Sequence, residues 1–286
     1  MRATVRVGGE DWDVDFDRAQ SLAIEVSFSG TEPRHFGAPR ASAQPLTAPG
    51  VPGRVADGAS CNCMTWTLTP HCNGTHTECA GHLTVEPMDA FRIAPTGLLP
   101  AALLTVTPQD ARHTRETSDP APRAGDSLVT RRRLMEAWAT GLTAAAAGSE
   151  SSIRALVIRT LPNPLEKRSR DYTGTVAPYL SREAGEWLVE RGIGHLVVDL
   201  PSIDRIEDEG RLTAHRVFFG LPPRSTELAR ARRSRCTLTE LAYVPDCAAD
   251  GEYLLELQVP ALAGDAVPSR PLLYAVRETA RASGSP

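Results

Sequence analysis

The chain has 286 residues, of which 41% are hydrophobic and 23% are charged. These are ordinary globular proportions, and they exclude a largely disordered chain, a collagen-like chain and a small disulfide scaffold. The net charge of −4 provides no broad positive field, so we expect no binding to a nucleic-acid backbone. No apolar stretch approaches the ~20 residues of a membrane-spanning helix, so we expect no membrane association either.

The N-terminal part predicts β-structure and a long loop. Residues 2–16 alternate between apolar and polar side chains on both sides of Gly8-Gly9, which indicates a β-hairpin. Residues 29–58 are rich in Gly, Pro, Ala and Arg without an apolar period, and they predict a long loop of the kind that often carries function. Further strands are expected at 22–28, 64–69 and 103–107.

The C-terminal part predicts helices between strands. An apolar stripe indicates a helix over 127–147, and Ser181 is a good N-cap for a helix that ends at Gly192 or Gly194. Strands at 153–159 and 195–200 enclose that second helix, which is the pattern of a βαβ unit. Final strands are expected at 254–262 and 272–276. We therefore expect one α/β domain over residues 1–280, followed by a frayed tail over 281–286.

The segment 71–82 reads HCNGTHTECAGH and contains three of the seven histidines of the chain. Imidazole, carboxylate and thiolate are the groups that bind zinc and related metals, so the segment predicts a metal site. In an extended backbone Cys72, His76, Glu78 and His82 face one side, whereas His71 faces the other side unless a bulge redirects it. Ordinary core histidines in a turn are the simplest alternative to a metal site.

A structural zinc site is a second alternative, built from Cys61, Cys63, Cys72 and Cys79. The spacing of these cysteines differs from the paired C-x2-C arrangement of a zinc ribbon, which argues against it. Cys61 and Cys63 are more simply interpreted as buried inert thiols.

The motif resembles the signature His-x-Gly-Thr-His-x-Asp-x-Pro-x-His of the putative cyclase family, which includes bacterial kynurenine formamidase and isatin hydrolase. The resemblance extends from about residue 20 to residue 277. It includes Tyr179-Leu180-Ser181 with the helix after it, and the segment 192–204 with its Asp-x-x-Ser-x-Asp turn. His215 and Glu240 stand where the family has a later histidine ligand and a glutamate ligand. The resemblance implies a kynurenine formamidase-like α/β fold with a central mixed sheet and flanking helices.

Three positions depart from the family signature. Cys72 replaces its first histidine, and His71 lies one position early; Glu78 replaces the aspartate and Ala80 the proline. An arginine-rich insert over 224–235 also lengthens the segment between His215 and Glu240. The ligand set carried over from the family is His71 or Cys72, His76, Glu78, His82, His215 and Glu240.

The resemblance also implies an activity, the metal-dependent hydrolysis of an amide or a cyclic amide by a metal-activated water. Zinc is the expected metal and manganese is possible. Glu78 would bridge two metals, and His82 would shuttle the proton between the attacking water and the leaving amine. The implied assembly is a homodimer or homotetramer, and the expected partner is a small amide substrate.

Other interpretations remain open at this point. The altered motif is compatible with a metal- or ligand-binding protein that has lost the chemistry, or with a redox sensor in which Cys72 and Cys79 oxidise. We interpret His195, Asp199 and Asp204 as scaffold. The N-terminus lacks the apolar segment of a secretory signal, so we expect a cytoplasmic protein.

Trp66, Trp138 and Trp187 are expected in the core, because each lies in an apolar stripe. Alone, His215 could be a strand-edge histidine and Glu240 a carboxylate on a helix surface. The arginines over 229–235 are most simply a solvated face, although they could contact an acidic substrate or a partner subunit.

Overall fold

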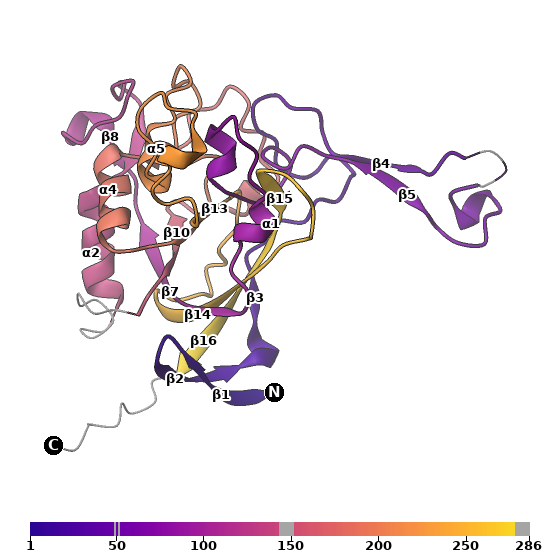
Figure 1. Cartoon of the computed structure of the whole chain (residues 1–286), viewed down its shortest axis with the longest axis horizontal. Coiled ribbons are helices and arrows are strands. Elements are labelled where there is room, and N and C mark those ends of the chain that lie inside the picture. Colours follow the sequence, from indigo (N-terminus) through magenta and orange to yellow (C-terminus); the bar gives the residue numbers. More distant parts are fainter. Residues whose placement is uncertain (49, 51, 143–151, 278–286) are drawn as a thin grey trace.

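A large mixed β-sheet forms the centre of the structure (Figure 1). The structure is a computed structural model, and it describes residues 1–48, 50, 52–142 and 152–277. Within this part of the chain the sheet has eleven strands, and it includes strands from both ends of the sequence. In sheet order, with β3 beside β16, the strands are β1 (Arg2–Val7), β2 (Glu10–Asp15), β16 (Arg270–Arg277), β14 (Gly251–Gln258), β7 (Leu98–Val106), β10 (Ala155–Thr160), β12 (His195–Val198), β13 (Thr237–Glu240), β6 (His76–Glu78) and β15 (Ala266–Pro268), and β3 is Gln20–Ser21.

The middle of the sheet is parallel. Strands β7, β10, β12 and β13 run in one direction, whereas β14 and β6 are antiparallel to their neighbours in this group. Helix α4 (Arg182–Glu190) connects β10 to β12, which confirms the predicted βαβ unit and the α/β class with a central mixed sheet. The other helices are α1 (Ala90–Ile93), α2 (Arg131–Gly141) and α5 (Thr213–Phe219).

The two faces of the sheet are covered differently. On one face α2, α4 and α5 pack on alternate residues of the parallel strands, with Trp138, Trp187 and Phe218 buried between them. On the opposite face, Leu22 and the segment 242–248 cover the intervening strand residues. The parallel strands are apolar on both faces, as expected where both are covered.

Two short sheets and six 3-10 turns complete the described secondary structure. One short sheet contains β8 (Gln109–Asp110), β9 (Ser127–Val129) and β11 (Tyr179–Leu180), and the other contains β4 (Ser42–Pro45) and β5 (Met64–Thr67). The turns are η1 (Phe16–Arg18), η2 (Val55–Asp57), η3 (Ala80–Leu83), η4 (Ala111–His113), η5 (Leu165–Arg168) and η6 (Leu228–Arg230).

The predicted start is correct for α4 and several residues too early for α2. The Ser181 hydroxyl accepts the Ala184 N–H, so Ser181 caps α4 as predicted. The helix expected from residue 127 begins only at Arg131, because Leu128 belongs to β9 and Thr130 supplies the N-cap. Residues 143–147 of that predicted helix, and the predicted tail over 281–286, lie outside the described residues.

The strand predicted at 22–28 is wrong. Its backbone groups bond to separate partners and form no ladder. Leu22 donates to the Pro271 carbonyl and accepts from Tyr243, and the Ile24 N–H donates to the Thr75 hydroxyl. Local alternation alone therefore did not determine a strand here, because neighbouring segments bind this backbone individually.

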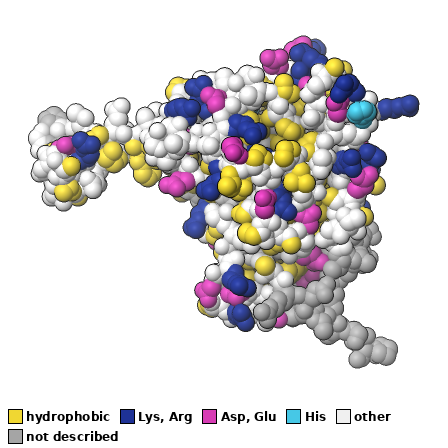
Figure 2. Space-filling view, turned by 180° about the vertical axis from the view of Figure 1, so that it is seen from behind, with side chains coloured by type: hydrophobic (Ala, Val, Ile, Leu, Met, Phe, Trp, Pro, Cys, Tyr) yellow, Lys and Arg dark blue, Asp and Glu magenta, His cyan; other side chains and the backbone are white. Residues whose placement is uncertain are grey.

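A two-stranded arm, β4–β5, projects from the body of the molecule (Figures 1 and 2). Strand β4 lies inside the predicted loop, and β5 confirms the strand predicted from residue 64. The core position predicted for Trp66 is wrong, because its side chain is 66% exposed and, among the described residues, its one ring contact is with Phe28, with ring centroids 5.2 Å apart. No helix among the described residues is long and apolar enough to span a bilayer.

Candidate metal centre

Strand pairing brings two parts of the sequence to one point of the sheet. His76 and Glu78 are two residues apart on β6, so their side chains lie on the same side of that strand. Strand β6 pairs with β13 in a register that places Glu240 directly opposite His76. All three side chains are buried. Glu240 is therefore the last residue of a buried strand, and the alternative of a carboxylate on a helix surface is wrong.

The backbone before β6 sets the direction of the His76 ring. Nδ1 of His76 lies 3.1 Å from the Gly74 carbonyl and donates to it, which leaves Nε2 as a bare acceptor. Glycine at position 74 lets this backbone pass close to Val26, because an added Cβ would lie 2.7 Å from Cγ2 of Val26. His76 thus turns Nε2 toward Glu240, at 3.7 Å from Oε2.

Helix α5 presents His215, so the alternative of a strand-edge histidine is wrong. The Asp204 carboxylate accepts hydrogen bonds from the backbone N–H groups of Ala214 and His215 and from Nδ1 of the His215 ring at 2.7 Å. One carboxylate therefore fixes the first turn of α5 and the orientation of the ring. Nε2 of His215 is left pointing at Glu78 and Glu240, 2.9 and 3.6 Å from their Oε1 atoms.

Glu78 lies at the centre of the cluster and is 1% exposed. Neither of its carboxylate oxygens has a well-aligned hydrogen bond, although both have a histidine nitrogen within 3.1 Å, and Nε2 of His76 and Nε2 of His215 have no well-aligned hydrogen bond either. Burial alone would raise the pKa of Glu78, but the positive charges of His82 and His215 outweigh it and hold that pKa well below its ordinary value. Burial opposes a charge on His215 in turn, yet Glu78 and Asp204 raise its pKa well above the ordinary value.

His71 and His82 line the more open side of the cluster, with about a quarter of each side chain exposed. Nδ1 of His71 is 3.1 Å from Oε2 of Glu78, and the rings of His71 and His82 are 4.3 Å apart. Both rings reach Oδ2 of Asp265, from Nε2 of His71 at 2.9 Å and from Nδ1 of His82 at 3.2 Å. Despite burial, Asp265 and Glu78 raise the pKa of His71 to about 10.

These side chains form three overlapping donor groups in which the candidate ligand atoms lie within 4.8 Å of one another. The groups are His71, His82 and Asp265; His71, His76 and Glu78; and Glu78, His82 and His215. His76 and His215 are oriented through Nδ1, and their Nε2 atoms point, with the carboxylates of Glu78 and Glu240, into the same buried space. Converging imidazole nitrogens and carboxylate oxygens are the donor set that a divalent cation takes in exchange for the imidazole protons. The residues present therefore fit a divalent metal.

The cysteines do not take part in these groups within the described part of the chain. Burial raises the pKa of the Cys72 thiol, and it raises that of Cys79, whose Sγ donates to the Met88 carbonyl, to about 12. Cys61 and Cys63 are exposed near the arm, so the prediction that they are buried is wrong. The geometry supports neither a four-cysteine zinc site nor an easily oxidised Cys72–Cys79 pair.

Sequence reasoning missed two residues at the site. Asp265 reaches it because β15 pairs with β6 and places Ala266 opposite Glu78. His35 comes from the long predicted loop, is 1% exposed, and has no hydrogen bond to either ring nitrogen. Burial lowers the pKa of His35 to about 4, with smaller effects from Glu240 and His76. The only signal for His35 was the scarcity of histidine, and Asp265 had none.

Several solved structures of other proteins share the fold of this chain. Eighteen solved chains match in fold, among them a predicted metal-dependent hydrolase from Bacillus stearothermophilus (15% identity, 90% of this chain and 98% of that chain, TM-score 0.53). Another is an isatin hydrolase bound to the product analogue thioisatinate, with 14% identity, coverage of 91% of this chain and 94% of that chain, and a TM-score of 0.56. A third is isatin hydrolase A from Ralstonia solanacearum, with 15% identity, coverage of 91% of this chain and 93% of that chain, and a TM-score of 0.52. At these identities the likeness shows the fold. A search of curated proteins finds no match.

A family model gives the more direct result. The model described as Putative cyclase matches residues 20–205, about two thirds of the chain. The match includes the histidine-rich segment and the βαβ unit, and it ends at the turn that contains Asp204. The chain therefore belongs to the Putative cyclase family.

Proposed function

We propose that the protein is a metal-dependent hydrolase that cleaves an amide or a cyclic amide. The observation that carries the proposal is the convergence of buried ligand atoms at the cluster. Nε2 of His76, Nε2 of His215 and both oxygens of Glu78 lack well-aligned hydrogen bonds, although the rings of His76 and His215 are each anchored through Nδ1. The solved relatives described as metal-dependent hydrolase and isatin hydrolase support the reaction class.

The ligands in this proposal are His71, His76, Glu78, His215 and Glu240, with zinc as the expected ion and manganese as the alternative. A bound ion of this kind lowers the pKa of water toward neutrality and polarises a carbonyl oxygen. Oε2 of Glu78 faces His71 and Oε1 faces His215, so the two oxygens of this carboxylate suit a bridging role. Glu240 uses Oε1 to accept the Ile203 N–H at 2.7 Å, which holds its carboxylate in place.

His82 is the proposed proton carrier. It lies at the open side of the cluster, and its Nδ1 is held by Asp265 at 3.2 Å, which leaves Nε2 to accept a proton from water and return it to the leaving amine. His35 is the proposed substrate contact, because its ring nitrogens are buried and bonded to no described residue.

The test is metal content together with turnover. Purified without chelator, the wild-type chain should contain one or two zinc or manganese ions, and His76→Ala should lose them. His113→Ala is the matched control, because His113 is exposed on η4 and outside the cluster. The loaded wild-type protein should then hydrolyse at least one member of a panel of formamides and cyclic amides. Equal metal content in wild type and His76→Ala would contradict the site.

A second candidate function is a metal- or ligand-binding protein on the same fold. It is favoured by the replacement of the first signature histidine by Cys72, whose thiol lies outside the donor groups. Metal bound at full stoichiometry, with no hydrolysis of any amide, imide or ester in the panel, would support this function over the hydrolase.

The proposal includes assembly as a homodimer or homotetramer and a cytoplasmic location. The projecting arm supports assembly, because Trp66 and Val55 are more than half exposed there and Met64 is 39% exposed. All six cysteines are free thiols, which favours a reducing compartment. A substrate for this site would be a small molecule.

A further inference from the structure

A hollow lies between α4, α5 and the loop that follows α5, apart from the histidine cluster. Its volume is about 480 Å³, within the range of small-molecule sites, and none of its lining residues belongs to the histidine cluster. Part of its wall is apolar, formed by Val189, Val217, Leu221, Pro222 and Pro223. Its charged lining residues are Arg182, Arg211, Arg216, Arg224, Arg232, Arg233 and Asp119.

Two of these arginines are fixed by backbone carbonyls. Arg216 donates to the carbonyl oxygens of Arg211 and Ser225, at 2.9 and 2.7 Å. Arg233 donates to the carbonyl oxygen of Phe218 at 2.9 Å and to that of Ile193. Neutral carbonyls orient a guanidinium without cancelling its charge, so both positive charges remain available.

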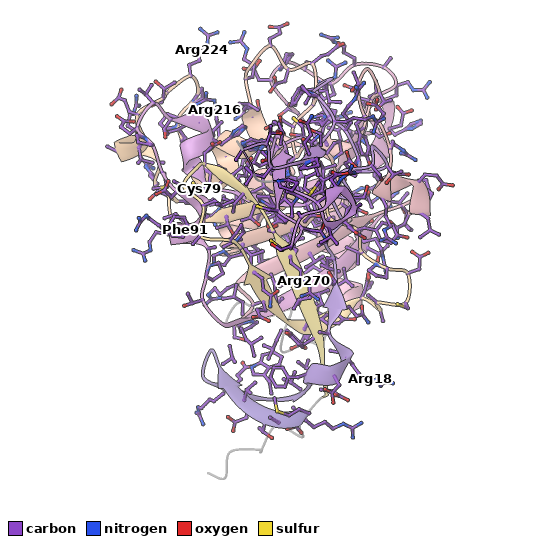
Figure 3. The ribbon with its side chains drawn as sticks, turned by 90° about the vertical axis from the view of Figure 1, so that its right-hand side faces the viewer. Arg18, Cys79, Phe91, Arg216, Arg224 and Arg270 are labelled. Atoms are coloured by element: carbon purple, nitrogen blue, oxygen red, sulfur yellow. The ribbon has the colours of Figure 1, made fainter. Side chains whose placement is uncertain are left out.

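Three more arginines have no polar partner in the part of the chain that the structure describes. Arg182, Arg224 and Arg232 make no hydrogen bond or ion pair there through their side chains. Arg224 and Arg216 lie at the end of the molecule opposite the β1–β2 hairpin (Figure 3). The backbone of Arg224 is in the left-handed region at φ 61°, a conformation that costs energy for a residue with a Cβ.

The acidic groups near the hollow are too few to balance this charge. Arg211 has Asp119 at 3.9 Å and Glu209 at 3.6 Å, and Arg216 is attracted by the charges of Asp204 and Asp208. Six lining arginines thus face four nearby carboxylates, in a chain with a net charge of −4. A local positive excess within a negative chain attracts an anion.

We propose that this hollow binds a small molecule with a phosphate or diphosphate group. The planar guanidinium fork matches phosphate oxygens in a bidentate manner, and several converging arginines suit a multiply charged group better than a single carboxylate. The valine, leucine and proline side chains of the wall would contact the apolar or aromatic body of the ligand. This site is independent of the proposed hydrolase activity.

The experiment is calorimetric titration of the full chain with pyrophosphate at low and at moderate salt. Wild type should bind one pyrophosphate per chain, more weakly at higher salt. The double variant R182Q/R232Q should bind at least tenfold more weakly, because two unpaired cations are removed. The control R6Q/R92Q removes two arginines that are about 70% exposed elsewhere and should bind within twofold of wild type.

A second double variant distinguishes loss of binding from misfolding. R224Q/R232Q changes two exposed side chains and should also weaken binding at least tenfold. No binding to wild type, or unchanged affinity in both arginine pairs, would overturn the proposal. Binding that survives both pairs but is lost in His82→Ala would place the anion at the histidine cluster and overturn it as well.

Discussion

The rings of His76 and His215 are each oriented by one hydrogen-bond partner on the side away from the centre of the cluster. The Gly74 carbonyl anchors His76, and the Asp204 carboxylate anchors His215. Such partners fix the tautomer and the ring direction of a metal ligand, and their loss typically weakens metal binding 10- to 100-fold. Asp204, expected only to be scaffold, thereby determines where a ligand nitrogen points.

The first prediction separates His71 from Cys72. His71→Ala should reduce metal affinity at least tenfold, because Nδ1 of His71 lies 3.1 Å from Glu78 inside a donor group. Cys72→Ala should keep the full metal content, because burial holds that thiol protonated. Elemental analysis after competition with a chelator measures both. Metal loss from Cys72→Ala with retention in His71→Ala would reverse the assignment.

The second prediction concerns pH and a histidine outside the cluster. Burial, together with the charge of Arg233, lowers the pKa of His195 to about 4, and its Nδ1 bonds to the Thr237 hydroxyl at 2.9 Å. The unfolded chain, with an ordinary histidine pKa near 6.5, then binds more protons between these values. The stabilising contribution of His195 is complete above pH ~6.5 and is lost as the pH falls toward 4, by at most ~1.4 kcal/mol per pH unit.

His195→Gln tests this dependence. Urea denaturation of the metal-free chain should give a free energy of unfolding that falls less steeply between pH 6.5 and 4 in the variant than in wild type. The exposed His113→Gln is the control and should leave the slope unchanged. Equal slopes in wild type and His195→Gln would show that burial does not suppress the charge of His195.

At the scale of elements, the carboxyl ends of β10 and β12 are joined by a buried ion pair. Nζ of Lys167, the only lysine, lies 2.7 Å from Oδ2 of Asp199 and bonds to the carbonyl and hydroxyl of Thr160. Asp199 also accepts the Thr160 N–H. This network connects the two strands to η5 just beyond the end of their parallel pairing.

The third prediction follows from the burial of that pair. Lys167→Met should destabilise the fold by about 3–5 kcal/mol, because it leaves a buried carboxylate without its counter-charge. Adding Asp199→Asn should recover part of the loss, since no charge then remains and the Thr160 N–H keeps an acceptor. Urea denaturation of both variants measures this difference. A double variant less stable than Lys167→Met would contradict the argument.

The elements that the sequence predicts correctly depend on local patterns, and those it misses depend on long-range pairing. The β1–β2 hairpin, α4 and the βαβ unit follow from local patterns, because turn glycines, a serine cap and apolar strands act over a few residues. The motif also indicated His76, Glu78 and His82, and the family resemblance added His215 and Glu240. Asp265 enters only through the pairing of β15 with β6, which no local pattern encodes.

Other differences have the same long-range origin. Residues 22–28 have strand-like alternation, yet their backbone is bound singly by segments from distant parts of the chain. Trp66 lies in an alternating strand that would be buried in a sheet, but β5 pairs only with β4 in the arm. A hydrophobic pattern specifies a strand without specifying what covers it.

At the scale of the whole molecule, the β4–β5 arm is the feature that a single chain does not explain (Figure 1). A two-stranded hairpin is marginally stable alone, and this one has large apolar side chains in solvent, with Trp66 at 66% and Val55 at 53% exposed. We propose that a second copy of the chain covers the arm. Met64→Ser with Trp66→Ser should therefore weaken assembly at least 30-fold, since loss of an interface tryptophan often costs about 2 kcal/mol or more.

Light scattering at micromolar concentration should give wild type a mass of two or four 30.8 kDa chains, and the double variant a mass close to one. The control Val85→Ser changes an apolar side chain that is 80% exposed outside the arm and should leave the mass unchanged. Because the arm lies outside the described histidine donor groups, metal content should be equal in all three proteins. A wild type that stays at the mass of one chain would show that the arm serves another purpose than self-association.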